Sequence, residues 1–108
     1  MIKFVAWVVG HIPIHPEAND EIALLWNYQD VLNVFWDFDD VILAYMAGHC
    51  HEGGHVYDHK RIHHITLPAI VECEADTNAF GTIHVHKEYL LIEGVGRVDT
   101  RRINFSKQ

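Results

Sequence analysis

Two continuous apolar runs, each followed by Gly-His, organise the first half of the sequence. Residues 5–9 read Val-Ala-Trp-Val-Val and lead into Gly10-His11, whereas residues 41–47 read Val-Ile-Leu-Ala-Tyr-Met-Ala and lead into Gly48-His49. A run that is apolar at every position is typical of a strand covered on both faces. The pattern therefore predicts two buried strands, each with a histidine just past its carboxyl end.

A loop and a helix are predicted between these strands. Residues 11–16 contain two prolines and favour an extended loop. Asn19 or Asp20 is expected to cap the helix that follows, since the next residue, Glu21, suits its first turn. The helix is predicted from apolar residues at helical spacing, closed by two aromatic residues: Leu24, Tyr28, Val31, Leu32, Phe35, Trp36 and Phe38. The order strand, helix, strand indicates a βαβ-like unit.

The second half of the sequence changes to hairpin patterns. Residues 55–57 and 62–67 flank a short polar turn, and residues 82–86 alternate before a turn at 87–88 and a return through 89–94. Alternation of this kind predicts antiparallel strands with one buried and one polar face. The fold class is therefore α+β, with mixed and antiparallel strands and one main helix, in a single domain spanning residues 1–108.

Composition narrows the classes of protein that the chain can represent. Its 108 residues are 49% apolar, with a formal charge of −7. No run approaches the roughly 20 apolar residues of a membrane span, and the acidic charge argues against nucleic-acid partners. Two cysteines do not make a disulfide framework, so a reducing, cytoplasmic location is expected. Trp7, Trp26 and Trp36 are interpreted as core residues.

Ten histidines are the unusual feature of the composition, and neutral imidazole is the commonest metal ligand in proteins. His11 and His49 follow the two predicted strands, at the sheet edge where ligands bind in α/β folds. Side chains two apart in an extended segment point the same way, so His51 is expected beside His49 while Cys50 faces away. His11, His49 and His51 are therefore candidate metal ligands, with loop histidines bonded to the backbone as the alternative.

The motifs resemble one family of phosphoesterases. Gly-His-x-His after a buried strand, preceded by a strand ending in Gly-His, is similar to the last two motifs of calcineurin-like metallophosphoesterases. The longer motifs Gly-His-Ile-Pro-Ile-His-Pro, Leu-Trp-Asn-Tyr-Gln-Asp, Ala-Gly-His-Cys-His-Glu-Gly-Gly and Asn-Ala-Phe-Gly-Thr-Ile-His-Val resemble the manganese-dependent ADP-ribose/CDP-alcohol diphosphatases. As an ordered set they cover essentially the whole chain.

The resemblance implies the carboxy-terminal part of a four-layer α/β/β/α sandwich that carries two metal ions, Mn²⁺ or alternatively Zn²⁺, Fe or Mg²⁺. It places His11 and His49 on one ion and His51 on the other, with His15, Cys50 and Glu52 as substrate-binding or supporting residues. The intact enzyme would cleave the diphosphate of nucleoside diphosphate conjugates, a small-molecule class of substrate. Its other metal motifs, including Asp-x-His, do not occur in this sequence, so the chain alone is expected to be inactive.

Several alternatives stay open. The chain can instead be a non-catalytic module that self-associates and binds at most one metal, and a homo-oligomer is expected in either case because the two apolar strands need cover. For His15, an exposed side chain with no functional role is as compatible with the sequence as a role near the substrate. His84 and His86 share one strand face, where a second metal site competes with a simple polar hairpin face, and the polar face is preferred.

Overall fold

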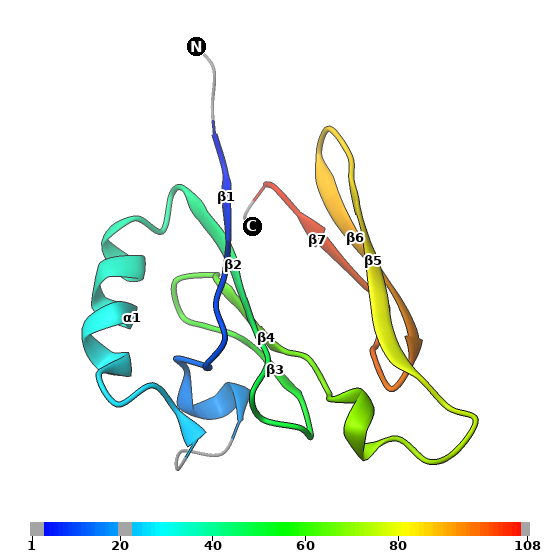
Figure 1. Ribbon diagram of the computed structural model, residues 1–108. Helices are drawn as coiled ribbons and strands as arrows, with labels where there is room; N and C mark the ends of the chain where they lie inside the picture. The colour runs from blue at the N-terminus through cyan, green and yellow to red at the C-terminus, as the bar shows by residue number, and fades with distance from the viewer. Residues whose placement is uncertain (1–3, 20–22, 107–108) are drawn as a thin grey trace.

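The computed structural model describes residues 4–19 and 23–106 and shows three layers: one helix and two sheets (Figure 1). The first sheet has the order β1-β2-β4-β3 and the second the order β5-β6-β7. The strands are β1 (Ala6–Val9), β2 (Ile42–Ala47), β3 (Gly54–Tyr57), β4 (His63–Thr66), β5 (Ala79–Val85), β6 (Tyr89–Gly96) and β7 (Arg101–Asn104). The helix is α1 (Tyr28–Asp37), with short 3-10 turns at η1 (Pro16–Ala18) and η3 (Ile70–Glu72). This arrangement confirms the predicted α+β class.

The first sheet is mixed. Strands β1, β2 and β4 run parallel to one another, and β3 returns antiparallel to β4. The predicted βαβ-like unit is present, because α1 connects the parallel strands β1 and β2. The carboxyl ends of β1, β2 and β4 therefore meet at one edge of the sheet, which is the edge that carries the predicted histidine loops.

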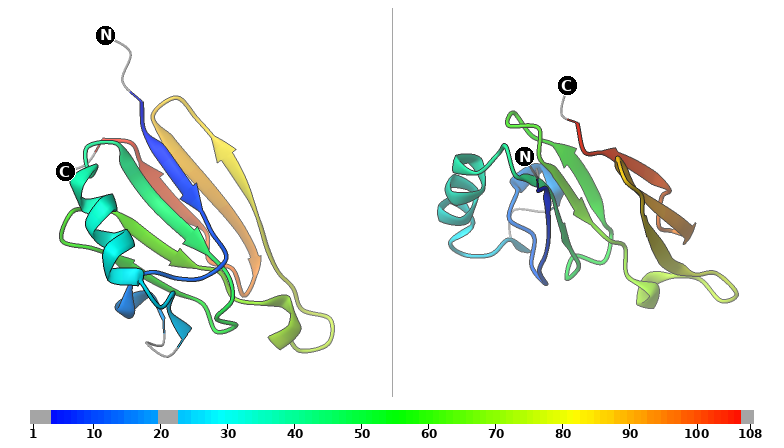
Figure 2. Two further views of the ribbon diagram at one scale, coloured as in Figure 1. Left: turned by 60° about the vertical axis from the view of Figure 1, so that its left-hand side comes forward. Right: turned by 90° about the horizontal axis from the view of Figure 1, so that it is seen from above.

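Two cores hold the layers together. Between the sheets, residues of β2 and β4 such as Leu43 and Ile65 pack on Leu90, Ile92 and Ile103 of the second sheet. On the other side of the first sheet, a second core joins the sheet to α1 through residues that include Leu32, Phe35 and Tyr45. The view from above in Figure 2 shows the resulting order of layers, helix, first sheet and second sheet. Strand β2 is buried along its whole length, as its continuous apolar run predicts.

Strand β1 differs from the prediction of a strand buried on both faces. It pairs with β2 on one side only and is half-buried, and the Val9 side chain at its end is 65% exposed. The apolar run predicted the strand correctly, but burial also needs a neighbour on the second side. Among the described residues, no strand lies there.

The helix starts later than its sequence pattern predicts. The expected cap at Asp20 and the first-turn Glu21 lie outside the described residues, while Asn19 ends η1 and its side-chain amide donates to the Gly53 carbonyl. The Leu25 N–H donates to the Pro13 carbonyl (3.0 Å), which ties this stretch to the preceding loop instead of to a helical turn. Trp26, expected in the core, is 91% exposed because it precedes the helix.

Candidate metal centre

The loops after β1 and β2 are joined by main-chain hydrogen bonds. The Gly10 N–H donates to the Met46 carbonyl and the Gly48 N–H donates to the His11 carbonyl, each at 3.0 Å. These bonds extend the pairing of the two parallel strands past their ends. His11 and His49 are thus held on adjacent strand ends by the backbone and not by their own side chains.

The backbone at Gly10 passes close to a tyrosine that fixes the first loop. The Tyr45 hydroxyl donates to the Ile12 carbonyl at 2.7 Å. A Cβ atom at Gly10 would lie 2.1 Å from that hydroxyl oxygen, far inside contact distance. Glycine is therefore required here by close approach, and the Gly-His motif has a steric reason.

The structure brings the imidazoles of His11 and His49 together. Their ring centroids are 5.2 Å apart with the planes at 70°, and both side chains are exposed. His49 has a backbone φ of 67°, and the Cys50 N–H donates to the Gly48 carbonyl across it (2.7 Å), so His49 sits at the centre of a three-residue turn. A left-handed backbone is uncommon for a residue with a side chain and tends to occur where function requires it.

His51 lies on the same loop but makes a separate contact. Its Nδ1 atom lies 2.9 Å from Oε1 of Glu72, and both side chains are about half exposed. A carboxylate can only accept, so Nδ1 carries the proton and Nε2 keeps its lone pair in the neutral ring. A carboxylate that orients an imidazole in this way is a common support for a metal-ligating histidine. Glu72 was not predicted, because it belongs to a short 3-10 turn 21 residues along the chain.

The supporting residues occupy different places. Cys50 is buried. Glu52 is exposed on the loop after His51. His15 is half-buried, accepts a hydrogen bond from the Glu17 N–H through Nδ1 (3.1 Å) and so caps η1. Burial and the neighbouring His64 lower the pKa of His15, which favours its neutral form.

The donor set present fits part of a metal centre. Within residues 4–19 and 23–106, no three His, Cys, Asp or Glu side chains come together closely enough to hold an ion. Two imidazoles on adjacent strand ends are nevertheless donors that suit Zn²⁺ or Fe, whereas Mn²⁺ would also need carboxylate oxygens. A complete site at this edge needs further ligands besides His11 and His49.

A buried polar network beneath the first loop was also missed by the sequence patterns. Asp58 Oδ2 accepts hydrogen bonds from His64 Nε2 (2.8 Å) and Trp36 Nε1 (3.0 Å), and Oδ1 accepts from the N–H groups of Lys60 and Ile62. Burial alone would raise the pKa of Asp58, but hydrogen bonds from His64, Trp36 and the Ile62 N–H outweigh burial and hold that pKa well below its ordinary value. Asp58 is therefore a buried carboxylate ion.

This network touches the histidine loop through one ring contact. The His64 ring lies 4.9 Å from the His15 ring, centroid to centroid, and His64 Nδ1 is buried with no hydrogen-bond partner among residues 4–19 and 23–106. The remaining histidines lie elsewhere. On the antiparallel pair β5–β6, His84 Nε2 lies 3.9 Å from Glu93 Oε2, and the His86 ring stacks on Tyr89. In the described part of the chain, these histidines belong to no group of three side chains that could hold a metal ion.

Comparison with known proteins places this geometry in a class. No protein-family model matches the chain. The structure superposes on a crystal structure of a dimetal phosphatase from Danio rerio with a TM-score of 0.90 and 34% sequence identity, covering 94% of this chain and 32% of that one. The chain thus has the fold of part of a dimetal phosphatase, with its histidine loops at the carboxyl ends of parallel strands.

Sequence comparison then narrows the resemblance. The chain is similar to the manganese-dependent ADP-ribose/CDP-alcohol diphosphatases, with 42% identity to the Bos taurus protein and 40% to the Homo sapiens protein, each over 94% of this chain. The Arabidopsis thaliana protein is 37% identical over 86% of it. The resemblance inferred from the motifs is confirmed. The chain spans about 30% of the length of these relatives.

Proposed function

We propose that this chain contributes His11, His49 and His51 to the dinuclear metal centre of a phosphohydrolase. Its substrate class is the nucleoside diphosphate conjugates, such as ADP-ribose and CDP-alcohols, and the bond cleaved is in the diphosphate. The observation that carries the proposal is the pairing of the His11 and His49 rings at 5.2 Å on the carboxyl ends of two parallel strands. The names of the similar proteins support both the substrate class and manganese.

The roles of the three histidines follow from their positions. His11 and His49, from adjacent strands, would share one ion. His51 would bind the other ion through Nε2, while its Nδ1–H donates a hydrogen bond to Glu72. The expected ions are Mn²⁺ or, alternatively, Zn²⁺, Fe or Mg²⁺. A pair of such ions, when bound, supplies Lewis-acid stabilisation of charge on the phosphate oxygens. The protein's own part is to fix the imidazoles before the ions arrive, through the backbone bonds between the two loops.

Further ligands are part of the proposal. Three imidazoles provide no carboxylate that bridges two ions, and the Asp-x-His pattern of the resembling family is absent from the sequence. Residues 1–108 would then act as the carboxy-terminal half of a single metallophosphoesterase domain, with the remaining ligands supplied by an amino-terminal half. Hydrolysis would require both parts, in a reducing compartment such as the cytoplasm, where Cys50 and Cys73 stay outside a disulfide.

Metal binding tests the first part of this proposal. The purified chain is titrated with Mn²⁺ while free Mn²⁺ is followed by electron paramagnetic resonance. Modest affinity is expected for wild type, with a loss of about tenfold or more in His49→Ala, because one of two imidazole donors is removed. His84→Ala is the matched control and should bind as wild type does. Equal losses in the two variants would show that the ion does not bind at the paired loops.

Activity tests the second part. The chain alone, with Mn²⁺ and ADP-ribose, should show no turnover above background, and turnover should appear when an amino-terminal segment from a similar diphosphatase is supplied. Turnover by the isolated chain that disappears in His49→Ala would mean that another carboxylate completes the site. Glu52 and Glu72, the carboxylates beside His51, would then be replaced first. Metal binding without any turnover in the reconstituted mixture would favour the alternative of a non-catalytic metal-binding module.

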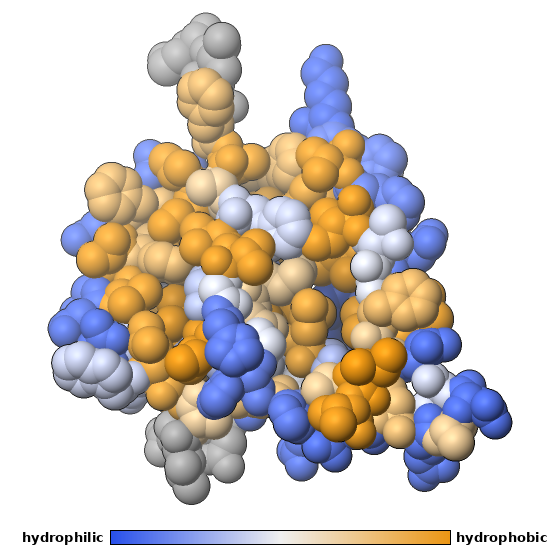
Figure 3. Space-filling view, viewed as in Figure 1, coloured by the Kyte–Doolittle hydropathy of each residue, from blue (hydrophilic) through white to orange (hydrophobic). Residues whose placement is uncertain are grey.

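Self-association is proposed on separate grounds. Strand β1 has one unpaired edge among the described residues, and Figure 3 shows a largely apolar face over the region that carries β1. Phe4, Val9 and Phe38 are each more than half exposed. A homo-oligomer would cover this surface. Sedimentation of wild type at micromolar concentration should show a dimer or larger species that Val8→Lys weakens; a monomer that unfolds cooperatively would exclude this assembly.

A further inference from the structure

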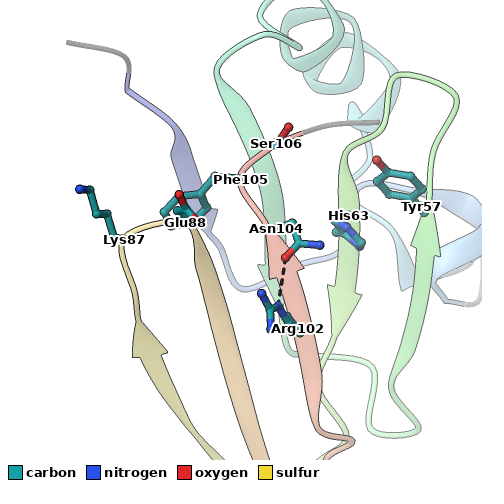
Figure 4. A pocket seen from close by; sticks show the side chains of 8 residues that line it. All are labelled: Tyr57, His63, Lys87, Glu88, Arg102, Asn104, Phe105 and Ser106. Atoms are coloured by element: carbon teal, nitrogen blue, oxygen red, sulfur yellow. Dashed lines mark hydrogen bonds between the residues drawn. The ribbon is translucent and has the colours of Figure 1, made fainter.

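A cleft of about 640 Å³ opens between the β3–β4 hairpin and the end of the second sheet (Figure 4). His63 from β4 and Asn104 from β7 approach each other across it, with Tyr57 on the hairpin side. The volume lies within the range of clefts that bind small molecules. This cleft contains none of the residues assigned to the proposed metal centre.

The cleft and the histidine loops lie at opposite ends of the first sheet. His63 is the first residue of β4, and Tyr57 is the last residue of antiparallel β3 beside it. His49 and His51 instead follow the carboxyl end of β2, which runs parallel to β4. A ligand in the cleft would therefore be separated from the metal centre by the length of the strands.

One wall of the cleft is aromatic and held in place. The ring centroids of Tyr57 and His63 are 4.4 Å apart, and His63 Nδ1 lies 3.1 Å from His55 Nε2. The hydrogen bond between the two imidazoles restrains the His63 ring. Tyr57 is 44% exposed, so its ring is accessible from the cleft. A flat ring of a ligand can stack on such a surface with little loss of side-chain freedom on the protein side.

The opposite wall is basic, although the whole chain has a formal charge of −7. Arg102 and Lys87 both line the cleft beside one acidic side chain, Glu88, but the Lys87 side chain extends away from the others (Figure 4), so Arg102 is the cation that can meet a ligand. The Arg102 guanidinium carbon lies 3.8 Å from the centroid of the Tyr89 ring, and its Nε–H donates to Asn104 Oδ1 (3.1 Å). A guanidinium has five N–H donors, and this bond uses one of them. Arg102 is thus already oriented while most of its donors are left for an anion.

We propose that this cleft is a second binding site, for a small ligand that carries a phosphate on a flat aromatic ring. Arg102 binds the phosphate, and the Tyr57–His63 wall stacks on the ring. Neither the contact to the phosphate nor the contact to the ring uses a metal ion. The site is independent of the proposed metal centre, and either proposal can fail without the other.

The test uses phenyl phosphate, the simplest molecule of this class, titrated into the chain in buffer that contains a chelator and followed by NMR chemical shifts. Saturable binding is expected, about tenfold tighter than that of inorganic phosphate because the ring adds stacking. Arg102→Gln should weaken phenyl phosphate by about tenfold or more, since a charge-assisted contact to the phosphate is lost. Tyr57→Leu should weaken phenyl phosphate but leave inorganic phosphate unchanged.

Three outcomes would overturn the proposal. One is the absence of saturable binding. A second is equal weakening by Arg97→Gln, the charge-matched control, because Arg97 does not line the cleft. A third is loss of binding in His49→Ala, which would place the ligand at the histidine loops. Circular dichroism checks that each variant is folded. If Arg102→Gln is not folded, Arg102→Lys replaces it, because Lys keeps the charge but loses the planar set of N–H donors, and weaker binding of phenyl phosphate is again expected.

Discussion

Replacing Asp58 by Asn is the sharpest test of what holds the histidine loop in place. Its carboxylate accepts four hydrogen bonds, from His64, Trp36 and two backbone N–H groups, and its side chain is fully buried. The side-chain amide of Asn keeps the shape but turns one acceptor oxygen into a donor. If the remaining oxygen stays on the two backbone groups, the amide N–H₂ faces the Trp36 N–H, and that donor loses its acceptor.

The expected cost of Asp58→Asn is about 3 kcal/mol in the free energy of unfolding. It combines the loss of charge assistance with one donor left without an acceptor, each of which costs roughly 1–3 kcal/mol. His64 offsets part of the cost by adopting the tautomer that accepts from the amide. A loss of about 3 kcal/mol lowers the folded-to-unfolded ratio roughly 150-fold, a large share of the stability of a domain of this size.

Urea unfolding at pH 7 measures the effect, with Asp40→Asn as the control, because Asp40 is exposed. The pH dependence gives an independent check. The pKa of Asp58 is lower in the folded than in the unfolded state, so its stabilisation is present above the unfolded value of about 3.9 and is lost as pH falls below it. Wild type and Asp58→Asn should therefore converge in acid. A loss at pH 7 no larger than that of Asp40→Asn would refute the role of the network.

Three further predictions concern the loops and their histidines. Gly10→Ala should lower the free energy of unfolding by about 1–3 kcal/mol, because the new methyl group displaces the Tyr45 hydroxyl; Gly48→Ala, where only one atom lies within 4.0 Å, is the milder control. Glu72→Gln should weaken Mn²⁺ binding about tenfold when an amino-terminal segment is supplied and His51 can hold the second ion, since the amide orients the His51 ring less well; the urea midpoint of the chain should stay unchanged. Burial, Arg101 and His64 lower the pKa of His55 in the folded state. The contribution of neutral His55 to the free energy of unfolding is therefore present above pH 6.5 and lost as pH falls below it, and this loss should be smaller in His55→Asn.

The sequence predicted those elements whose own residues determine them. The continuous apolar run of β2 and the alternating pattern of β5 and β6 each gave the right strand. Gly-His after each run correctly brought His11 and His49 together, because parallel pairing fixes where adjacent strands end. These predictions needed no knowledge of distant contacts.

The patterns failed where a distant contact decides the structure. The helix begins at Tyr28 because the preceding stretch bonds to Pro13, which helical spacing alone does not reveal. Strand β7, with Arg101, Arg102 and Asn104, has too little apolar alternation to be predicted and exists through its pairing with β6. The patterns predict a polar turn at residues 58–61, but the fold buries Asp58 of this turn against His64 and against Trp36 of the helix.

Strand β4 shows how one short segment serves two separate sites. Its adjacent histidines point to opposite faces of the sheet: His63 lies on the face toward the second sheet, in the cleft, and His64 lies on the helix side, on the Asp58 carboxylate. Replacing His64 should therefore affect stability and the His15 contact, whereas replacing His63 should affect the cleft and leave the Asp58 network intact. Because the alternation of the strand enforces this division, a single-residue slip of β4 against β2 would exchange the two roles. The apolar core between the sheets excludes such a slip, since the slip would turn Ile65 out of that core and leave His64 facing it.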